Sequence, residues 1–507
     1  MIKKHNTEKN AGFVIPALLV VIIIFSFLVI GLADIISSTL GEATRTESKQ
    51  MSLNIAEAGI NYYLWHLSHA NSDYKDGQTT PSTPDATLGY GPYEHEYRDE
   101  FGNKRGKFTL YIIPGSNGSN VVTVKSIGQA SGILQNTSRT IQAKIGAPSF
   151  STFAVVGNSE LWFGNTEVAD GPVHSNAGVK MDGPNNSEVT SSNSTYIPSS
   201  GSGPGSGSVK PGVWCDTAIT SPNCNTRSKA SWRYPATSVD FNKLTADLCN
   251  LKKSAINNQA SNACNTRPAR TSSYIPPNQT NYSINRGYLI ILNTNGTYTL
   301  KSVTNERDDR SDYGAALSVS TIATNIAAPS SGVIFVEDNV WVVSEAGGFD
   351  GRVTIASARL AVNGATTITI ADNVKYKDQY TGNDAIGLIA EDNIDVAPYV
   401  PVPLTIHGAL IAQSGKVQFR PEYNYTGGNT IGYINSNQTL NFFGSIASNE
   451  QWTWSWIRCG SNSASCWSGF KNNTTQYDEN LRYSPPPSFP VTSTYDILEW
   501  REVIVAP

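Results

Sequence analysis

The sequence predicts a mainly β protein that begins with one long α-helix. Three observations carry this prediction. Residues 13–33 form an apolar run without a charged side chain, and residues 41–67 contain no proline and place apolar residues at helical spacing. Beyond residue 89, apolar and polar residues alternate in short segments separated by Gly, Asn and Asp, which is typical of strands joined by tight turns.

The apolar run has the length and the flanking charges of a transmembrane helix. Lys3, Lys4 and Lys9 precede it, and no further charged residue occurs before Asp34. About twenty residues at 1.5 Å rise per residue extend over about 30 Å, which matches the hydrocarbon core of a bilayer. Because the positive charges lie before the run, residues 1–12 are predicted to stay in the cytoplasm as a leader and the remainder to be exported.

Residues 41–67 predict an amphipathic helix continuous with this transmembrane helix. Apolar residues recur there at intervals of four, three, four and three: Met51, Ile55, Ala58, Tyr62 and Trp65. This spacing places them on one helix face. We expect residues 34–148 to form one unit, in which that face packs on a sheet of three or four antiparallel strands that includes 107–113, 120–127 and 140–145.

Two motifs resemble those of the PilX-type minor pilins of type IV pili. Residues 54–60, NIAEAGI, contain the AEAG signature of that family, and the Gly12-Phe13 junction resembles a prepilin peptidase cleavage site. The resemblance implies a pilin-like α+β stem and cleavage between Gly12 and Phe13. As partners it implies other pilins, the pilus assembly machinery, prepilin peptidase and the membrane.

One position departs from the pilin pattern. Major pilins carry a glutamate five residues into the mature chain, which pairs with the N-terminal amine of a neighbouring subunit, and Ala17 stands at that position here. An unpaired charge in a low-dielectric filament core is costly. The resemblance therefore implies an accessory or tip subunit rather than the bulk subunit. The alternative is a signal-anchor helix that is never processed.

Length and composition are typical of an exported protein with more than one domain. The chain has 507 residues, of which 15% are charged, and its net charge is −4. The length predicts at least two domains. No basic block is present in the sequence, which argues against a nucleic-acid partner.

The cysteines indicate an oxidising compartment. They fall into three close pairs: Cys215 with Cys224, Cys249 with Cys264, and Cys459 with Cys466. Six cysteines allow fifteen pairings, but pairing between neighbours closes the shortest loops and suits the cell exterior. Free or mixed thiols and a metal site are the alternatives. A zinc site would require C-x-x-C spacing or nearby histidines, and the sequence has neither beside these cysteines.

Residues 149–507 predict a passenger domain built from a repeated strand–turn–strand unit. Residues 332–342 and 386–396 are near copies around an Asp-Asn pair, and residues 370–374 are a shorter echo. The pairs recur about 34 and then about 20 residues apart, which is the range of solenoid coils. Such units with inward Val and Ile predict a right-handed parallel β-helix, whose coils bury apolar stacks. A β-sandwich is the alternative.

An insertion is expected within this passenger at about residues 184–280. Residues 184–213 are rich in Ser, Gly, Asn and Pro and predict a surface loop. Residues 239–262 place apolar side chains at roughly helical spacing beside Cys249 and Cys264. This second part predicts a disulfide-stapled helix that projects from the side of the solenoid.

Three groups have the residue types of a metal site or of a nucleophile: His66, His69 and Asp73; Asp308, Asp309 and Asp312; and His174 with Ser175. We expect the first to be a solvated group at the helix end. The second is expected to be a solvated turn, since it lacks a calcium-binding loop and interleaved arginines offset its charge. The third lacks a G-x-S-x-G motif and is expected to be a turn.

A carbohydrate-active enzyme is the rival class, because β-helices include polysaccharide lyases and hydrolases. Such enzymes place carboxylates together on one face, and five acidic residues would be candidates: Glu337, Asp338, Glu391, Asp392 and Asp395. We expect Asp-Asn pairs to shape the turns instead, because both residues bond their own backbone there. A tryptophan cluster predicts either a sugar-stacking surface or one buried strand face: Trp452, Trp454, Trp456 and Trp467.

The sequence and its resemblance therefore predict a non-enzymatic, single-pass membrane protein without a cofactor or a metal, exported to the cell surface or a pilus. Its expected place is at or near the tip of a type IV pilus. Its expected role is pilus assembly, adhesion to a surface glycan or protein, or both. The alternatives are a membrane-anchored carbohydrate-active enzyme and an adhesin that is independent of pili.

Overall fold

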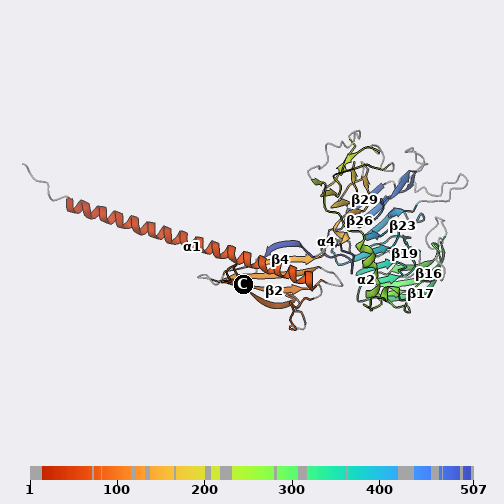
Figure 1. Cartoon of the computed structure of the whole chain (residues 1–507), viewed down its shortest axis with the longest axis horizontal. Helices are drawn as coiled ribbons and strands as arrows, with labels where there is room; N and C mark the ends of the chain where they lie inside the picture. Colours follow the sequence, from red (N-terminus) through yellow and green to blue (C-terminus); the bar gives the residue numbers. More distant parts are fainter. Residues whose placement is uncertain are drawn as a thin grey trace, which may run out of the picture. The chain divides into compact units, whose positions relative to one another are not determined.

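The chain is mainly β with one long N-terminal helix, as its sequence predicts (Figure 1). It divides into two compact units: unit 1 comprises Met1–Ile113, Thr123–Ala143 and Glu499–Pro507, and unit 2 comprises Pro114–Val122 and Lys144–Leu498. The structure is a computed structural model that describes residues 14–70, 73–80, 83–115, 121–131, 137–164, 167–199, 207–216, 231–278, 283–306, 317–360, 364–420, 439–457, 467–470, 472–491 and 495–503.

Helix α1 (Val14–His69) has 56 residues and two different surroundings along its length. Every residue from 14 to 43 is exposed. Farther along, one face is buried, at Ser52, Ile55, Ala56, Gly59, Ile60, Tyr63 and Leu67. The predicted stripe is therefore displaced by about one residue: Ile55 is buried, but Trp65 is 58% exposed. The larger apolar residues predict the wrong centre for the buried face of α1, because small residues of the helix form its closest contact with the sheet.

The sheet of unit 1 has five strands in the order β1-β2-β3-β4-β30. The antiparallel pairs β1–β2 and β2–β3 follow chain order, and three strands match those expected. The edge strand β30 comes from the C-terminal end, so unit 2 is inserted between β4 and β30. The expected boundary, which gave all of 149–507 to the passenger, is corrected accordingly. The strands are β1 (Tyr90–Arg98), β2 (Lys104–Ile113), β3 (Val122–Ala130), β4 (Ser138–Gly146) and β30 (Asp496–Val503).

Glycine allows α1 to lie directly against this sheet. A Cβ atom at Gly128 on β3 would overlap the Ser52 carbonyl oxygen and the Ala56 amide nitrogen of α1. The Ser52 hydroxyl donates to the Thr137 carbonyl at 2.8 Å and accepts the Ala130 N–H at 3.2 Å. Close backbone approach and these hydrogen bonds fix the register of helix and sheet.

The described residues of unit 2 form two large sheets, one three-stranded sheet and two hairpins. The eleven-stranded sheet has the order β13-β9-β7-β5-β26-β24-β22-β20-β18-β14, with β29 also paired to β26. Its strands are β5 (Val155–Gly157), β7 (Val173–Ser175), β9 (Val189–Ser191), β13 (Trp232–Arg233), β14 (Tyr274–Ile275), β18 (Val333–Val336), β20 (Arg352–Ser357), β22 (Ala385–Ala390), β24 (Leu404–Ala412), β26 (Thr439–Ser448) and β29 (Asn472–Tyr477).

The seven-stranded sheet has the order β17-β16-β15-β19-β21-β23-β25, and the three-stranded sheet has the order β12-β8-β6. Their strands are β6 (Leu161–Phe163), β8 (Val179–Met181), β12 (Val213–Trp214), β15 (Gly287–Leu292), β16 (Thr297–Glu306), β17 (Leu317–Ala327), β19 (Asn339–Ser344), β21 (Ile368–Ile370), β23 (Ile394–Val396) and β25 (Val417–Phe419). Two hairpins, β10 (Thr195–Tyr196) with β11 (Lys210–Pro211) and β27 (Ser455–Ile457) with β28 (Trp467–Gly469), complete the strands described.

From β18 to β26 the chain alternates between the two large sheets, and each strand from β20 onward pairs in parallel with the strand two places earlier. Apolar side chains consequently form continuous buried stacks. One stack runs through Ile334, Ile355, Leu388, Leu410, Ile446, Val155, Val173 and Val189. All eight are at most 1% exposed. Fully buried branched residues in parallel strands are what the continuous Val and Ile runs of the sequence predict.

This stack crosses a seam between segments that are far apart in the sequence. Ile446 of β26 pairs with Val155 of β5, so the last strand of the segment β14–β26 lies beside the first strand of the segment β5–β13. The chain leaves the sheet order at β13 and re-enters at its opposite end, at β14. The connecting segment contains α2 (Lys243–Ala255) and the short 3-10 helix η5 (Ala263–Asn265).

Helix α2 packs against the outer face of the eleven-stranded sheet. Leu248 and Leu251 are buried in one apolar cluster with Phe335 of β18 and Ile389 of β22. The helix predicted within 239–262 is thus confirmed, but it lies on the sheet instead of projecting from it. The expected insertion at 184–280 is also corrected, because β9, β12, β13 and β14 within it are sheet strands.

The repeat seen in the sequence is present in the structure, but its two near copies are not adjacent strands of a sheet. The two near copies are β18–β19 and β22–β23, and β20 lies between β18 and β22. The copies are therefore two strands apart rather than neighbours. Within the pairs, each asparagine side-chain oxygen accepts a backbone N–H from a segment farther along the chain: Asn339 from Thr367, Asn373 from Thr405, and Asn393 from Lys416.

Valine at position 128 is expected to separate α1 from the sheet. The Gly128→Val side chain would overlap the helix backbone, and overpacking of this kind costs about 1–3 kcal/mol. Hydrogen exchange of residues 52–67 in the full-length protein should increase correspondingly. Gly41→Ala is the control, because a Cβ at Gly41 meets nothing within 4 Å. Equal exchange in the two variants would contradict the described packing.

Candidate functional site

The first half of α1 is apolar and exposed on all sides. It belongs to a helix that is long and apolar enough to cross a membrane. For example, Ile22, Phe25 and Phe27 are 50%, 66% and 71% exposed. A helix that is apolar all round requires a bilayer or the interior of a larger assembly. This surface is therefore the first candidate functional site.

Three hydroxyl side chains in this stretch bond to their own helix. The Ser26 hydroxyl donates to the Ile22 carbonyl at 2.7 Å, and the Ser38 and Thr39 hydroxyls both reach the Ile35 carbonyl. Such back-bonding is how hydroxyl groups are satisfied in lipid, where water is absent. Ala17 lies in the exposed stretch. The predicted junction at Gly12 and Phe13 lies outside the described residues, so cleavage there stays a prediction.

The predicted histidine group at the end of α1 is not gathered into one site. His66 Nε2 lies 3.2 Å from Asp73 Oδ2, whereas His69 bonds back to its own helix. A second pair joins His95 Nε2 to Asp76 Oδ2 at 2.6 Å. No group of three His, Cys, Asp or Glu side chains is placed to hold a metal in the part of the chain that the structure describes.

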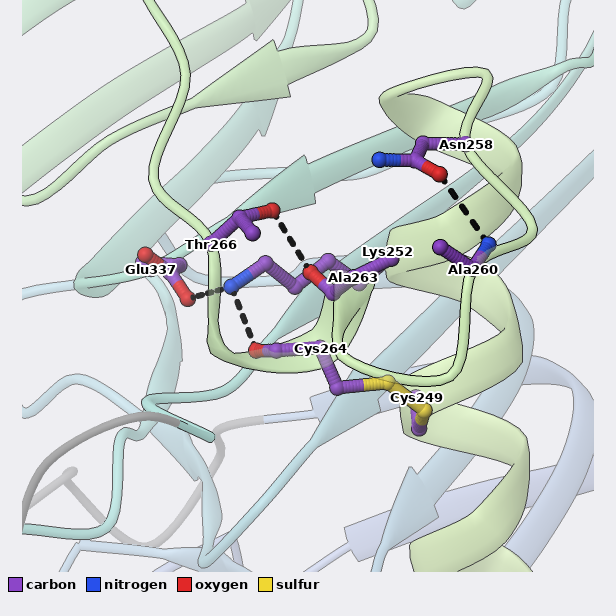
Figure 2. The surroundings of a disulfide bond; sticks show 8 residues. All are labelled: Cys249, Lys252, Asn258, Ala260, Ala263, Cys264, Thr266 and Glu337. Atoms are coloured by element: carbon purple, nitrogen blue, oxygen red, sulfur yellow. Dashed lines mark hydrogen bonds and ion pairs between the residues drawn. A yellow bond between two sulfur atoms is a disulfide. The ribbon is translucent and has the colours of Figure 1, made fainter.

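Glu337, one of the candidate catalytic acids, is buried in a cluster that anchors the segment after α2. Figure 2 shows its carboxylate against Lys252 beside the disulfide. It also accepts Arg267 Nε–H at 3.0 Å and the Tyr274 hydroxyl at 2.8 Å. Lys252 and Glu337 are both fully buried. The carboxylate is thus occupied by neighbouring donors instead of facing a cleft.

Three further candidate acids lie at turns and accept hydrogen bonds there. Asp338 accepts the Asn278 backbone N–H at 2.8 Å, and Glu391 accepts the Arg359 backbone N–H at 2.8 Å. Asp392 accepts the side-chain amide of its neighbour Asn393 at 3.0 Å. Glu337 and Glu391 follow strands that are two places apart in the sheet, so they do not form an adjacent pair.

The fifth candidate, Asp395, lies on the outer side of the seven-stranded sheet. Gln418 Nε2 donates to it at 2.9 Å, and burial raises the pKa of this carboxyl to about 6. Nearby Glu306 accepts from Trp341, Tyr399 and Arg420. Burial acts to raise the Glu306 pKa, but Arg420 and the hydrogen bonds together hold it below its usual value. Both carboxyls are less than 10% exposed, and both accept hydrogen bonds from neighbouring side chains.

His174 and Ser175 are buried in strand β7. His174 Nδ1 lies 2.8 Å from Thr190 Oγ1, and the Ser175 hydroxyl donates to the Ser159 carbonyl at 2.8 Å. Burial lowers the pKa of His174. Their partners lie in neighbouring segments of the sheet, which agrees with a structural role. The acidic group Asp308, Asp309 and Asp312 lies outside the described residues.

The tryptophan cluster is a buried strand face at Trp452 and Trp454. These rings are 6% and 2% exposed, and their centroids are 5.7 Å apart. They fill the core near the seam, where Trp452 also contacts Phe163 of β6. A sugar-stacking surface is therefore wrong for these two residues. Trp456 is half-buried and donates to the Phe419 carbonyl, and the side chain of Trp467 lies outside the described set.

One of the expected disulfides is present in full. Cys249 of α2 is bonded to Cys264, with their Cα atoms 5.4 Å apart (Figure 2). Cys215 is also disulfide-bonded. Cys224, Cys459 and Cys466 lie outside the described residues, so the other two pairings stay predictions.

A mixed aromatic and polar groove lies beside β26 in unit 2. Its cavity is about 590 Å³, and it is lined by residues of five segments, among them Asn186, Tyr380, Phe443, Tyr477 and Glu479. No sequence pattern predicts the groove, because its lining residues are up to hundreds of positions apart in the sequence. They lie together only because the sheet places their segments side by side.

Known proteins show little similarity to this chain. No protein-family model and no curated protein matches the sequence. Among solved structures, the crystal structure of the competence-associated pilin ComZ from Thermus thermophilus aligns over 90% of this chain and 98% of its own. The identity is 12% and the TM-score is 0.25, and a likeness of this extent carries no argument about function.

Removal of the Glu337 carboxylate is expected to destabilise unit 2 strongly. Glu337→Ala leaves the Lys252 ammonium buried without its charge partner, which costs about 3–5 kcal/mol. Asp350→Ala is the control, because it breaks an exposed ion pair with Lys377 that is worth less than about 1 kcal/mol. Denaturant unfolding of the two variants measures the difference. Equal losses would contradict a structural role for the buried cluster.

Asp395 is expected to make unit 2 less stable as the pH rises. Its folded-state pKa of about 6 lies above the ordinary aspartate value of 3.8, so its contribution is complete below about pH 4 and is lost as the pH rises through 6. A shift of this size corresponds to about 3 kcal/mol. Asp395→Asn should therefore stabilise the protein at pH 8 and have little effect at pH 4. An equal effect at both pH values would refute this assignment.

Proposed function

We propose that the chain is an exported, minor pilin-like protein of the PilX type. The observation that carries the proposal is the division of α1 into an exposed apolar half and a half packed on a largely antiparallel sheet. A stem of this kind can be held in a bilayer and then transferred into a filament, because both environments cover the same apolar surface.

In this proposal the partners of α1 are other pilins, the pilus assembly machinery and the membrane, and prepilin peptidase removes residues 1–12. Ala17 removes the carboxylate that sets the stacking register between major pilins. We therefore place the protein at or near the filament tip, where contacts on one side of the stem suffice. A membrane-anchored adhesin that never enters a pilus is the alternative.

For unit 2 we propose a right-handed parallel β-helix that acts as the passenger. The alternation of strands between two sheets and the uninterrupted apolar stack support this architecture. Its roles would be adhesion, pilus assembly or both, without catalysis. The non-enzymatic assignment is favoured by the acidic residues at the turns, whose described carboxylates accept hydrogen bonds or ion pairs from their neighbours.

Mass spectrometry of the N-terminal peptide tests this function in the native host. A mature chain that begins at Phe13 and occurs in the sheared surface fraction is the expected result. Gly12→Leu should retain the leader and disappear from that fraction, whereas the neighbouring Ala11→Val should not. An intact leader confined to membranes would contradict the pilin proposal and leave a signal-anchored surface protein.

A further inference from the structure

The groove beside β26 arises from a fork in the eleven-stranded sheet. The first part of β26 pairs with β29, up to Gly444 with Tyr477, and its last part pairs with β5, from Ile446 with Val155. Two strands thus share one edge of β26 and diverge where one ends and the other begins. The divergence leaves the groove between the end of β29, the turns near residues 170 and 186, and Tyr380.

One wall of the groove is an aromatic surface that is rigidly supported. Tyr380 is 72% exposed, and its ring lies 5.7 Å from the ring of Phe443. Phe443 packs in turn on His407 and Tyr376, with ring centroids 5.7 and 6.3 Å away. An exposed tyrosine that packs on a buried aromatic ring offers a flat apolar face to a ligand.

The floor of the groove is also fixed by hydrogen bonds. The Tyr477 hydroxyl donates to the Ser151 and Thr152 carbonyls, both at 3.0 Å. The turn opposite is closed by the Gly171 N–H, which donates to Asn186 Oδ1 at 2.9 Å. A Cβ at Gly171 would lie 2.7 Å from the Tyr477 Cβ, so glycine is required for this close approach. The groove is therefore largely formed before any ligand arrives.

The polar groups around this floor are side-chain amides and carboxylates. Gln476 and Glu479 are exposed at the end of β29 and in the following turn, and Asn186 is exposed on the opposite side. The amides accept and donate hydrogen bonds in a plane, whereas the carboxylate accepts them. Asp170, Asp478 and Glu479 outnumber the cation Arg482 in the lining, which disfavours a phosphate backbone or another polyanion.

We propose that this groove binds a neutral oligosaccharide chain, with one sugar ring stacked on Tyr380 and hydroxyl groups bonded to Gln476, Glu479 and Asn186. Sugar rings have an apolar face of C–H groups and an edge of hydroxyls, and the groove presents the complement of both. The proposal deepens the adhesive role proposed above and depends on that role only for its setting.

Binding is tested on the full-length protein in lipid nanodiscs by isothermal titration calorimetry. The probes are chitohexaose, cellohexaose and maltohexaose, with a galacturonic acid hexamer as the anionic probe. We expect saturable binding of at least one neutral probe, and Tyr380→Ala should weaken it about tenfold or more. Because Tyr380 is exposed, this variant should keep its fold, which circular dichroism checks.

Phe101→Ala is the matched control, since it removes an aromatic side chain that is 80% exposed in unit 1. It should leave the affinity unchanged. Failure of all three neutral probes to bind, an equal loss in the two variants, or tighter binding of the anionic probe would overturn the proposal. The binding assay requires no filament, so the absence of sugar binding would not contradict the pilin proposal. Retention of the leader in the host, in turn, would not contradict sugar binding by the groove.

Discussion

The parallel pairing of β26 with β5 is the contact on which the arrangement of unit 2 depends. It joins Ile446 to Val155, which are far apart in the sequence, and makes one continuous apolar stack from two successive segments. Without it, each segment would expose the end of its core and a row of unpaired backbone groups, and both are costly in water. An amide ladder reinforces the seam: Asn176 donates to Asn158 at 2.7 Å, and Asn158 donates to Asn449 at 2.8 Å.

Two other features follow from the seam. Because both segments progress in the same direction through the sheet, the chain must return from β13 to β14 along the outside, and α2 with its disulfide covers that face. The buried pair of Lys252 and Glu337 then fixes the returning segment. The groove has the same origin, since β29 and β5 pair with successive parts of one edge of β26. The candidate binding site is thus a product of topology, not of a local motif.

The sequence predicts features that arise from local periodicity and fails for those that depend on distant pairing. The helix through the apolar run before Asp34, the strands near residues 107–145 and the neighbouring pair Cys249–Cys264 are predicted from local signals, and the structure contains each of them. The position of the buried face of α1 was predicted wrongly, because it depends on a residue of another element. Gly128 of β3 has no side chain, so the helix backbone at Ser52 and Ala56 lies directly against it. Strand β30 and the groove around Tyr380 were missed, since each is formed by segments brought together only in the folded chain.

The most direct test of the seam is a disulfide introduced across it. Asn158 and Asn449 have side chains in contact and directly follow the adjacent strands β5 and β26, so Asn158→Cys with Asn449→Cys places two cysteines one strand spacing apart, about 5 Å. Asn176→Cys with Asn449→Cys is the matched control, about 10 Å apart and beyond disulfide reach. Peptide mass spectrometry after mild oxidation should find the bond in the first pair alone. Its absence there, or equal bonding in both pairs, would contradict the continuous stack.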